Sequence, residues 1–235
     1  DIGSGKARVR VGKQKLAAYL GAPKYTHGAI DAINEIGLAN GLAWTSFGGE
    51  TLQIEVQIVP GSGQVILTGK LGDVMQESAK AALTFIKAHA EEFGITLPLD
   101  KKDIHLHVPE GAVPKDGPSA GITIMTAMLS ALSGIPARAD TAMTGEITLR
   151  GRVLEIGGLR EKVLAAYRAG IKRVLIPKAN EKDLSDVPDE VKANMEIIGV
   201  ASAFDVIPLA LEHTPQKTAD AFIPQHAHSG AAAAQ

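Results

Sequence analysis

The chain has 235 residues, 45% hydrophobic and 21% charged, a composition typical of one globular domain with room for a small extension. Its net charge of -2 gives no general attraction to nucleic acid or to a membrane surface. It has no cysteine, which excludes disulfides, thiolate-bound zinc and a cysteine nucleophile and agrees with a reducing compartment. No apolar run reaches the ~18 residues of a membrane span, and the first residues lack the apolar core of a signal peptide. We therefore expect a cytoplasmic protein without nucleic-acid or membrane partners.

The two ends of the chain differ from its middle. Residues 6–12 alternate like a short strand, and residues 13–25 predict a helix that Gly21 and Pro23 end. Residues 213–235 have no periodicity and finish in small residues, so we expect a disordered tail.

The middle of the chain opens with an alternating strand over residues 51–59. Four apolar residues of this strand share one face: Leu52, Ile54, Val56 and Ile58. The turn at residues 60–63 and the strand-like stretch at 64–69 predict a hairpin with it.

The later elements mix strands and helices. In chain order we expect a helix over 72–93 ended by Gly94, a strand over 104–108, a helix from Pro118 to Gly134, two strands over 141–156 with a turn at Gly151, a helix over 159–170 with Gly170 as its C-cap, strands over 173–177 and 195–200, and a helix over 203–212 that Pro208 kinks or shortens. Such a mixture predicts an α+β fold of sheets with packed helices.

Ser119 lies in Gly117-Pro118-Ser119-Ala120-Gly121, which matches the G-x-S-x-G nucleophile elbow of α/β-hydrolases. An elbow serine follows its strand at once, whereas ten residues separate Val108 from Ser119. At or beyond the end of the regular pattern lie the only histidines downstream: His213, His226 and His228. The elbow interpretation fits poorly, and an ordinary helix start is the simpler alternative.

A helix start nevertheless suits a nucleophilic serine, because its unpaired N–H groups and positive dipole favour a developing oxyanion. Without a histidine, the remaining arrangement is Ser-Lys, in which a neutral lysine takes the serine proton. Lys162 fits best, since it follows Gly157-Gly158 in the first turn of a helix, where an ammonium is electrostatically unfavourable. From spacing alone, a solvated lysine that pairs with Glu161 or another acid is the favoured interpretation, and a general base is the alternative.

Four long stretches carry a resemblance to a known family: residues 41–50, 61–83, 114–121 and 143–170. Together they resemble the proteolytic domain of Lon, the ATP-dependent serine protease, in one register from about Gly37 to Glu212. The resemblance implies the fold of ribosomal protein S5 domain 2, hydrolysis of peptide bonds in unfolded or damaged proteins, and a hexameric ring. It also implies that residues 1–36 are a remnant of the ATPase small subdomain with a linker, that residues 37–212 are the proteolytic domain, and that a tail follows.

The same resemblance implies roles for individual residues. Ser119 would be the nucleophile and Lys162 the general base of a Ser-Lys dyad. Thr144 would hold the lysine amine by a hydrogen bond, and Asp116 would capture Lys162 when the site is inactive. Gly117 and Ala120 flank the serine as supporting residues of the motif.

The phosphate-binding motifs of an ATPase are absent from the sequence. Gly3-Ser4-Gly5-Lys6 precedes an alanine and lacks the earlier glycine, and Gly69-Lys70 precedes a leucine. We therefore expect no cofactor in this chain. By resemblance, ATP and magnesium would belong to an ATPase domain in cis in the full-length enzyme.

Four further residues need an interpretation. His105 and His107 share a strand face and could ligate a metal, but a third ligand is missing, so we expect a packed or hydrogen-bonded pair and no metal site. Trp44, the only tryptophan, suits core packing, although in the family its strand approaches the substrate cleft. Glu55 lies on the polar face of its strand, where a solvated carboxylate is the simpler interpretation and a place near the dyad the alternative.

Two functions from different classes remain. One is a Ser-Lys endopeptidase domain that acts on unfolded polypeptide. The other is a non-catalytic module, because S5-like folds also serve RNA binding and assembly, and a fold alone does not imply activity. The joint presence of Ser119, Thr144 and Lys162 favours the endopeptidase.

Overall fold

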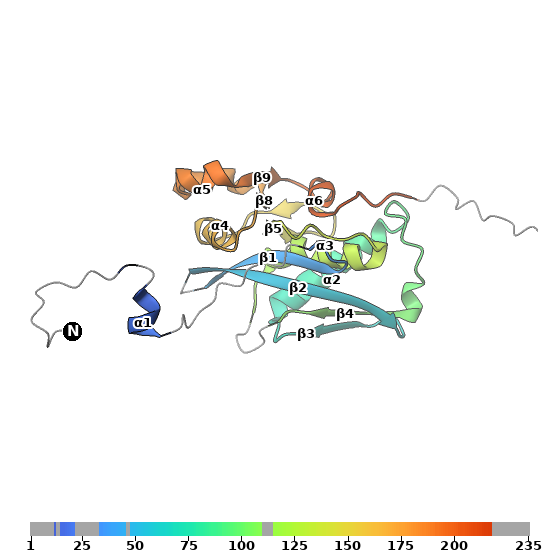
Figure 1. Ribbon diagram of the computed structural model, residues 1–235. Helices are drawn as coiled ribbons and strands as arrows, with labels where there is room; N and C mark the ends of the chain where they lie inside the picture. Colours follow the sequence, from blue (N-terminus) through green and yellow to red (C-terminus); the bar gives the residue numbers. More distant parts are fainter. Residues whose placement is uncertain (1–11, 13–14, 22–32, 46–47, 110–114, 218–235) are drawn as a thin grey trace, which may run out of the picture.

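A computed structural model of the protein describes residues 12, 15–21, 33–45, 48–109 and 115–217 (Figure 1). Within these residues, a mixed seven-stranded sheet has the order β3-β4-β2-β1-β5-β8-β9, and β6 pairs with β7 in a separate hairpin. The strands are β1 (Leu38–Thr45), β2 (Gly48–Pro60), β3 (Val65–Thr68), β4 (Lys102–His107), β5 (Thr141–Met143), β6 (Glu146–Ile147), β7 (Val153–Leu154), β8 (Arg173–Pro177) and β9 (Glu196–Val200). The expected α+β class is confirmed.

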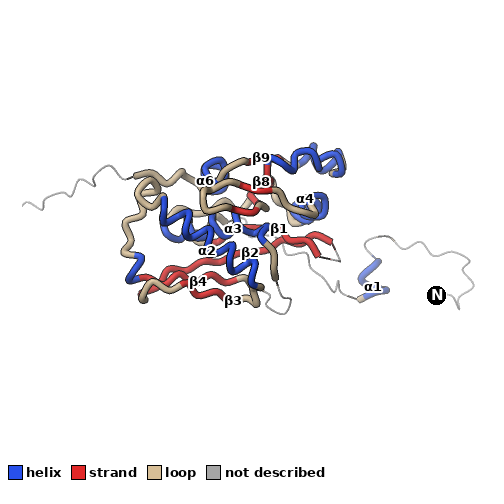
Figure 2. The backbone as a smooth tube through the Cα atoms, turned by 180° about the vertical axis from the view of Figure 1, so that it is seen from behind, coloured by secondary structure: helices blue, strands red, loops and turns tan. Residues whose placement is uncertain are grey.

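Helices pack against both faces of the sheet (Figures 1 and 2). The α-helices are α1 (Leu16–Leu20), α2 (Asp73–Ala88), α3 (Gly121–Ser133), α4 (Leu159–Arg168), α5 (Asp189–Asn194) and α6 (Ala203–Ala210), and the 3₁₀ helices are η3 (Leu99–Lys101), η4 (Pro118–Ala120) and η5 (Lys178–Asp186).

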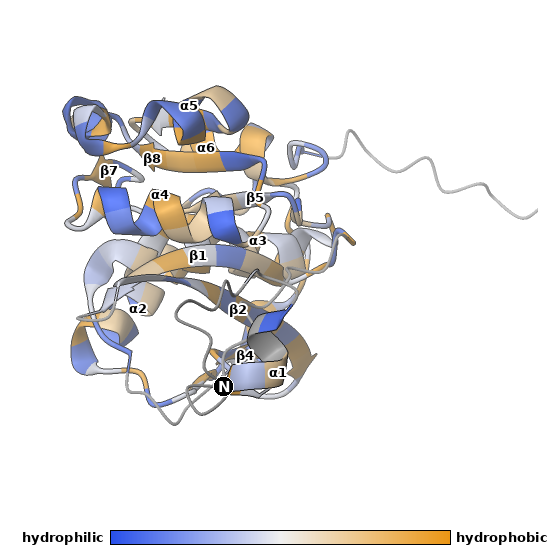
Figure 3. Cartoon of the chain, turned by 60° about the vertical axis from the view of Figure 1, so that its left-hand side comes forward, coloured by the Kyte–Doolittle hydropathy of each residue, from blue (hydrophilic) through white to orange (hydrophobic). Residues whose placement is uncertain are grey.

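Strand alternation divides the core into two clusters. Ala142 and Val174 pack with α4, whereas their neighbours Met143 and Leu175 pack with α2, α3 and α6. Successive side chains of a strand point to opposite faces, so each short parallel strand serves both clusters. Figure 3 shows α4 above β1, with both hydrophilic and hydrophobic residues along the helix.

The alternating strand at residues 51–59 is confirmed inside the longer β2, with Leu52, Ile54 and Val56 buried. The predicted hairpin between β2 and β3 is wrong. β4 lies between the two strands, antiparallel to β2 and parallel to β3. The turn after β2 wraps around Asp103 of β4, whose carboxylate accepts hydrogen bonds from the N–H groups of Ser62 and Gln64 at 2.7 and 2.9 Å.

Glycines lie at the ends of both site helices. Gly134 is the left-handed C-cap of α3, as expected. The C-cap predicted at Gly170 is wrong by one residue: Ala169 is the C-cap of α4, and Gly170, with φ 81°, follows it. The largest differences in the predicted helix boundaries are that α2 ends at Ala88 rather than at residue 93 and that a 3₁₀ turn precedes α3. Pro208 lies inside the short α6, as expected.

The region after β4 departs further from the prediction. The first of the two strands expected over residues 141–156 is split into β5 of the main sheet and β6 of the hairpin, while the turn at Gly151 is confirmed. η5 and α5 were not predicted.

The two ends of the chain are only partly described. α1 lies within the predicted N-terminal helix, whereas the strand predicted at 6–12 falls almost entirely outside the described residues, as does most of the C-terminal tail.

Two helices on opposite faces begin at the same end of β5. α3 precedes β5 and runs back along the sheet, while α4 follows β5 after the β6–β7 hairpin. The carboxyl end of β5, followed by Thr144, is therefore where both helix N-termini meet. In open sheets with parallel strands covered by helices, ligands commonly bind at the carboxyl ends of the strands.

Candidate active site

Ser119 lies at the centre of η4, the 3₁₀ turn that leads into α3, and is half-buried. Pro118 occupies the first position of the turn, where its missing N–H leaves no bond unmade. Gly117, just before it, has φ 120°, a backbone conformation that residues other than glycine rarely adopt. The sequence GPS thus forms a sharp entry that presents the serine at a helix start.

Lys162 lies in the first turn of α4, where its own N–H donates to the carbonyl of Gly158 at 3.1 Å. The residue is only 3% exposed. No acidic group within the described residues forms an ion pair with it, and Glu161 pairs instead with Arg160 at 3.9 Å. Burial lowers the pKa of Lys162 from 10.5 to about 8. The alternative of a solvated, acid-paired lysine is wrong.

Thr144 connects the lysine to the serine turn. The amine of Lys162 donates to Thr144 Oγ1 at 3.1 Å, and that hydroxyl donates to the carbonyl of Ser119 at 3.2 Å. The same carbonyl accepts the N–H of Gly145 at 2.8 Å, and Thr144 is itself held by its N–H on the carbonyl of Leu175 at 3.0 Å. Fixed backbone on both sides therefore holds the amine and the serine turn in one network.

The serine hydroxyl itself makes no hydrogen bond within 3.5 Å to any described residue, so the structure does not show a direct Ser119–Lys162 bond. Asp116 does not pair with Lys162 either. Its Oδ1 accepts the N–H groups of Met75 and Gly117 at 3.1 and 2.8 Å. Ala120, on the other side of the serine, is buried at the end of η4. The lysine amine is therefore not captured by Asp116 in this state.

Trp44 is 59% exposed, so the prediction of core packing is wrong. Among the described residues, β5 pairs with β1 at Asn40 and Gly41 alone, so β1 continues past it, and the indole lies against Gly158 at the start of α4. Glu55 is exposed on β2 opposite His107, as a solvated carboxylate. It lies six residues along the strand from Gly49, which abuts Glu161 of α4, or about 20 Å at the rise of a strand. The structure does not bring Glu55 to the lysine.

The two histidines of β4 form the expected hydrogen-bonded group. Thr68 Oγ1 lies 3.0 Å from Nε2 of His105 and 2.7 Å from Nδ1 of His107. In the described part of the chain, no three His, Cys, Asp or Glu side chains are arranged to hold a metal ion.

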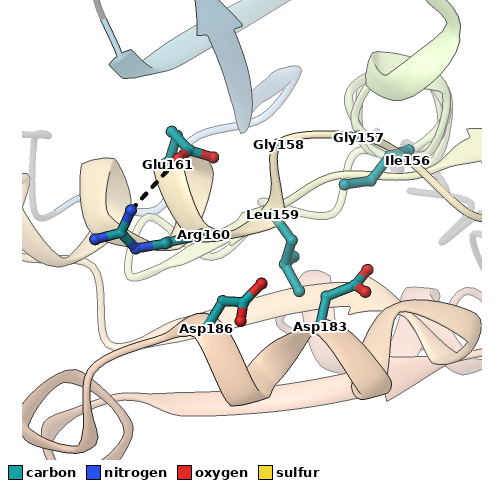
Figure 4. A pocket seen from close by; sticks show the side chains of 8 residues that line it. All are labelled: Ile156, Gly157, Gly158, Leu159, Arg160, Glu161, Asp183 and Asp186. Carbon is teal, nitrogen blue, oxygen red and sulfur yellow. Dashed lines mark ion pairs between the residues drawn. The ribbon is translucent and has the colours of Figure 1, made fainter.

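An open cavity of about 540 Å³ adjoins the first residues of α4. Its lining runs from Ile156 to Glu161 and includes Asp183 and Asp186 of η5, which lie across from Leu159 (Figure 4). None of Ser119, Thr144 and Lys162 lines it. We locate the candidate site by the hydrogen-bond network around Thr144 rather than by this cavity.

A serine at a helix start and a buried lysine in one network, on an α+β sheet, have the features of a serine-type hydrolase. Comparison with known proteins names the family. The family model of the Lon protease (S16) C-terminal proteolytic domain matches residues 10–213. The chain therefore belongs to the Lon protease family and corresponds to its proteolytic domain.

Curated relatives agree with this assignment. The chain is 55% identical over 212 residues to a Lon protease of Nitratidesulfovibrio vulgaris, covering 90% of the chain and 26% of that protein. It is 51% identical over 237 residues to a Lon protease of Brucella suis, covering 97% and 29%. It is 54% identical over 209 residues to Lon protease 1 of Myxococcus xanthus, covering 88% and 26%. The chain thus spans about a quarter of the length of these relatives. Among its described residues, no helix is long and apolar enough to cross a membrane.

Proposed function

We propose that the chain is a serine endopeptidase domain in which Ser119 is the nucleophile and Lys162 the general base, acting on unfolded polypeptide. The observation that carries the proposal is the contact between the buried Lys162 amine and Thr144, which is also bonded to the serine turn. A purely structural module gains nothing from this arrangement, because burying an ammonium without an acidic partner destabilises the fold.

The chemistry follows from the proton positions. Neutral Lys162 keeps a lone pair that can accept the Ser119 proton while one of its N–H groups donates to Thr144. The serine oxygen then attacks the substrate carbonyl, and the lysine returns its proton to the departing amine. The Lys162 amine then deprotonates a water molecule, which attacks the acyl-enzyme. The lysine proton returns to the Ser119 oxygen as the acyl group leaves, so both residues are regenerated.

Burial supports the choice of base. A pKa of about 8 leaves roughly a tenth of Lys162 neutral at pH 7. An ordinary lysine would be neutral in less than about one molecule in a thousand at that pH. The backbone N–H groups of Ser119 and Ala120 in this turn, with the positive dipole of α3, support stabilisation of the oxyanion.

The substrate backbone has a candidate docking edge. Beyond Gly41, no described strand pairs with β1 on its β5 side, and β1 touches the turn that carries Ser119. We propose that an extended polypeptide adds along residues 42–44 of this edge. The exposed Trp44 would then contact substrate side chains at the end of the strand.

We carry three further expectations forward as parts of the proposal. The sheet belongs to the ribosomal protein S5 domain 2 type, longer family members assemble as homo-hexamers, and an ATPase domain in cis that uses ATP and magnesium delivers their substrates. The short coverage of the relatives supports a further domain in those proteins. The cytoplasm, as a reducing compartment, remains the expected location.

Cleavage of an unstructured protein such as casein, measured without ATP, tests the catalytic assignment. Ser119→Ala and Lys162→Arg should both be inactive, because alanine has no nucleophile and a guanidinium keeps its proton in this pH range. His105→Ala should stay active, since its ring bonds to Thr68 on another part of the sheet. An active Lys162→Arg protein would remove Lys162 from the mechanism.

A further inference from the structure

We infer that Gly72 and Asp116 act together as positioning residues. The Asp116 carboxylate binds at the N-terminus of α2 beside Gly72, and this contact holds the turn that carries Ser119 in place. The inference rests on the proposed function for its catalytic consequence. The contact itself can be measured independently of any cleavage.

Helix α2 has no side-chain cap of its own. Its N-cap residue is Gly72, in a sequence position where Ser, Thr, Asp or Asn commonly satisfies the first N–H groups. The missing acceptor comes from another segment, because Asp116 Oδ1 accepts the N–H of Met75 in the first turn at 3.1 Å. A carboxylate at this end also interacts favourably with the helix dipole.

The space for this carboxylate exists only because residue 72 is glycine. A methyl group built on Gly72 would overlap the carboxylate carbon and Oδ2 of Asp116. The backbone of Gly72, with φ -69° and ψ 170°, is one that alanine adopts without strain. Glycine is therefore needed here for the approach of Asp116 and not for its conformational freedom.

Backbone contacts bring the two segments together. The N–H of Lys115 donates to the carbonyl of Lys70 at 3.2 Å, and the N–H of Gly72 donates to the carbonyl of Lys115 at 2.8 Å. Lys70 has a positive φ of 55°, a costly conformation for a residue other than glycine. A strained connection is thus retained at the place where the loop before the serine docks.

Only Gly117 and Pro118 separate Asp116 from Ser119, and the ring of Pro118 fixes its own φ. Asp116 Oδ1 also accepts the N–H of Gly117 at 2.8 Å. The bond to Met75 therefore fixes the start of η4 relative to α2. The far side of the turn is fixed by the N–H of Gly145 on the Ser119 carbonyl. Losing the bond between Asp116 and Met75 should therefore loosen the start of η4 and weaken the bond between Gly145 and Ser119.

Hydrogen exchange of individual amides, measured by NMR on the whole chain, tests the inference. In Gly72→Ala, exchange at Met75 and at Gly145 should accelerate at least about fivefold, the effect of one lost hydrogen bond. The amide of Gln76, which donates to the carbonyl of residue 72 at 3.0 Å, should keep its protection and serves as the internal control. Far-UV circular dichroism checks that the variant is folded.

Two variants of Asp116 separate capping from charge. Asp116→Asn keeps an oxygen that accepts the Met75 N–H, so it should stay near the parent in exchange and in cleavage. Asp116→Ala should behave like Gly72→Ala, with kcat lowered about tenfold or more and KM unchanged, because positioning acts on the chemical step.

Parent-like protection of Met75 or of Gly145 in a folded Gly72→Ala protein would overturn the inference. So would an unchanged kcat in that variant, or an Asp116→Asn protein as impaired as Asp116→Ala. A parent chain without any cleavage would instead count against the proposed function, and the exchange rates would still decide whether the contact positions the turn.

Discussion

Replacing Lys162 by methionine should abolish cleavage and at the same time stabilise the folded chain at pH 7. Methionine matches the length of the lysine stem and has no charge. The buried ammonium has a single hydrogen-bond acceptor among the described residues, Thr144 Oγ1, and no acidic partner. Its removal relieves a desolvation cost that the fold otherwise carries.

The magnitude follows from the pKa of Lys162, which burial lowers from 10.5 to about 8. Each pH unit between these values corresponds to about 1.4 kcal/mol, so the charged lysine destabilises the folded state by about 3 kcal/mol at pH 7. Loss of the Thr144 bond offsets about 1 kcal/mol. We expect a net increase of about 2 kcal/mol in the free energy of unfolding.

The sign of the pH dependence is specific. Between pH 8 and 10.5 the unfolded chain binds more protons at this lysine than the folded chain, so the stability of the parent rises with pH. The destabilisation is complete below pH 8 and is lost as the pH approaches 10.5. The advantage of Lys162→Met should therefore disappear in that window.

Urea unfolding at pH 7, 9 and 10.5, followed by circular dichroism, measures the difference. Lys80→Met on the exposed surface of α2 is the matched control and should change stability by less than about 0.5 kcal/mol. A Lys162→Met protein that is less stable than the parent at pH 7, or whose advantage does not change with pH, would refute the reasoning.

The remaining predictions concern catalysis and assembly. Cleavage by the parent should rise with pH through one ionisation near 8, the pKa of Lys162, and an inflection near 6.5 would point to a histidine base instead. Thr144→Val should lower kcat at least about tenfold in a casein assay, because the amine loses the group that orients it; parent-like kcat would contradict this role. Gly117→Ala should destabilise the chain by about 1–3 kcal/mol through its φ of 120°, and thermal melts at parent level would argue against strain there. Trp44→Ala should raise KM for casein with little effect on stability, as expected of an exposed docking side chain, whereas a large loss of stability would assign it to packing. In sedimentation, the 235-residue chain should form at most weak hexamers, because the proposed ATPase domain would supply much of the ring's interface area, and a stable hexamer at low micromolar concentration would contradict this expectation.

The sequence by itself determined the local elements that polar and apolar residues or glycines specify. The alternation over residues 51–59 predicts β2, and the glycines at 134 and 170 predict the ends of α3 and α4, because each signal depends on neighbouring residues alone. The long motifs around Ser119 and Lys162 also sufficed to identify the family.

Only the tertiary structure decided which elements are neighbours and which side chains are buried. Strand alternation reports that one face is covered but not which strand lies alongside, so the insertion of β4 between β2 and β3 could not be read from their turn. Trp44 is a large apolar residue of the kind common in cores, yet β1 extends beyond its pairing with β5 and Trp44 is exposed. Spacing favoured a solvated Lys162, whereas packing of α4 against the sheet buries the amine beside Thr144 and lowers its pKa. A lysine's protonation depends on the solvent that surrounds it, and that solvent is excluded by residues far away in the sequence.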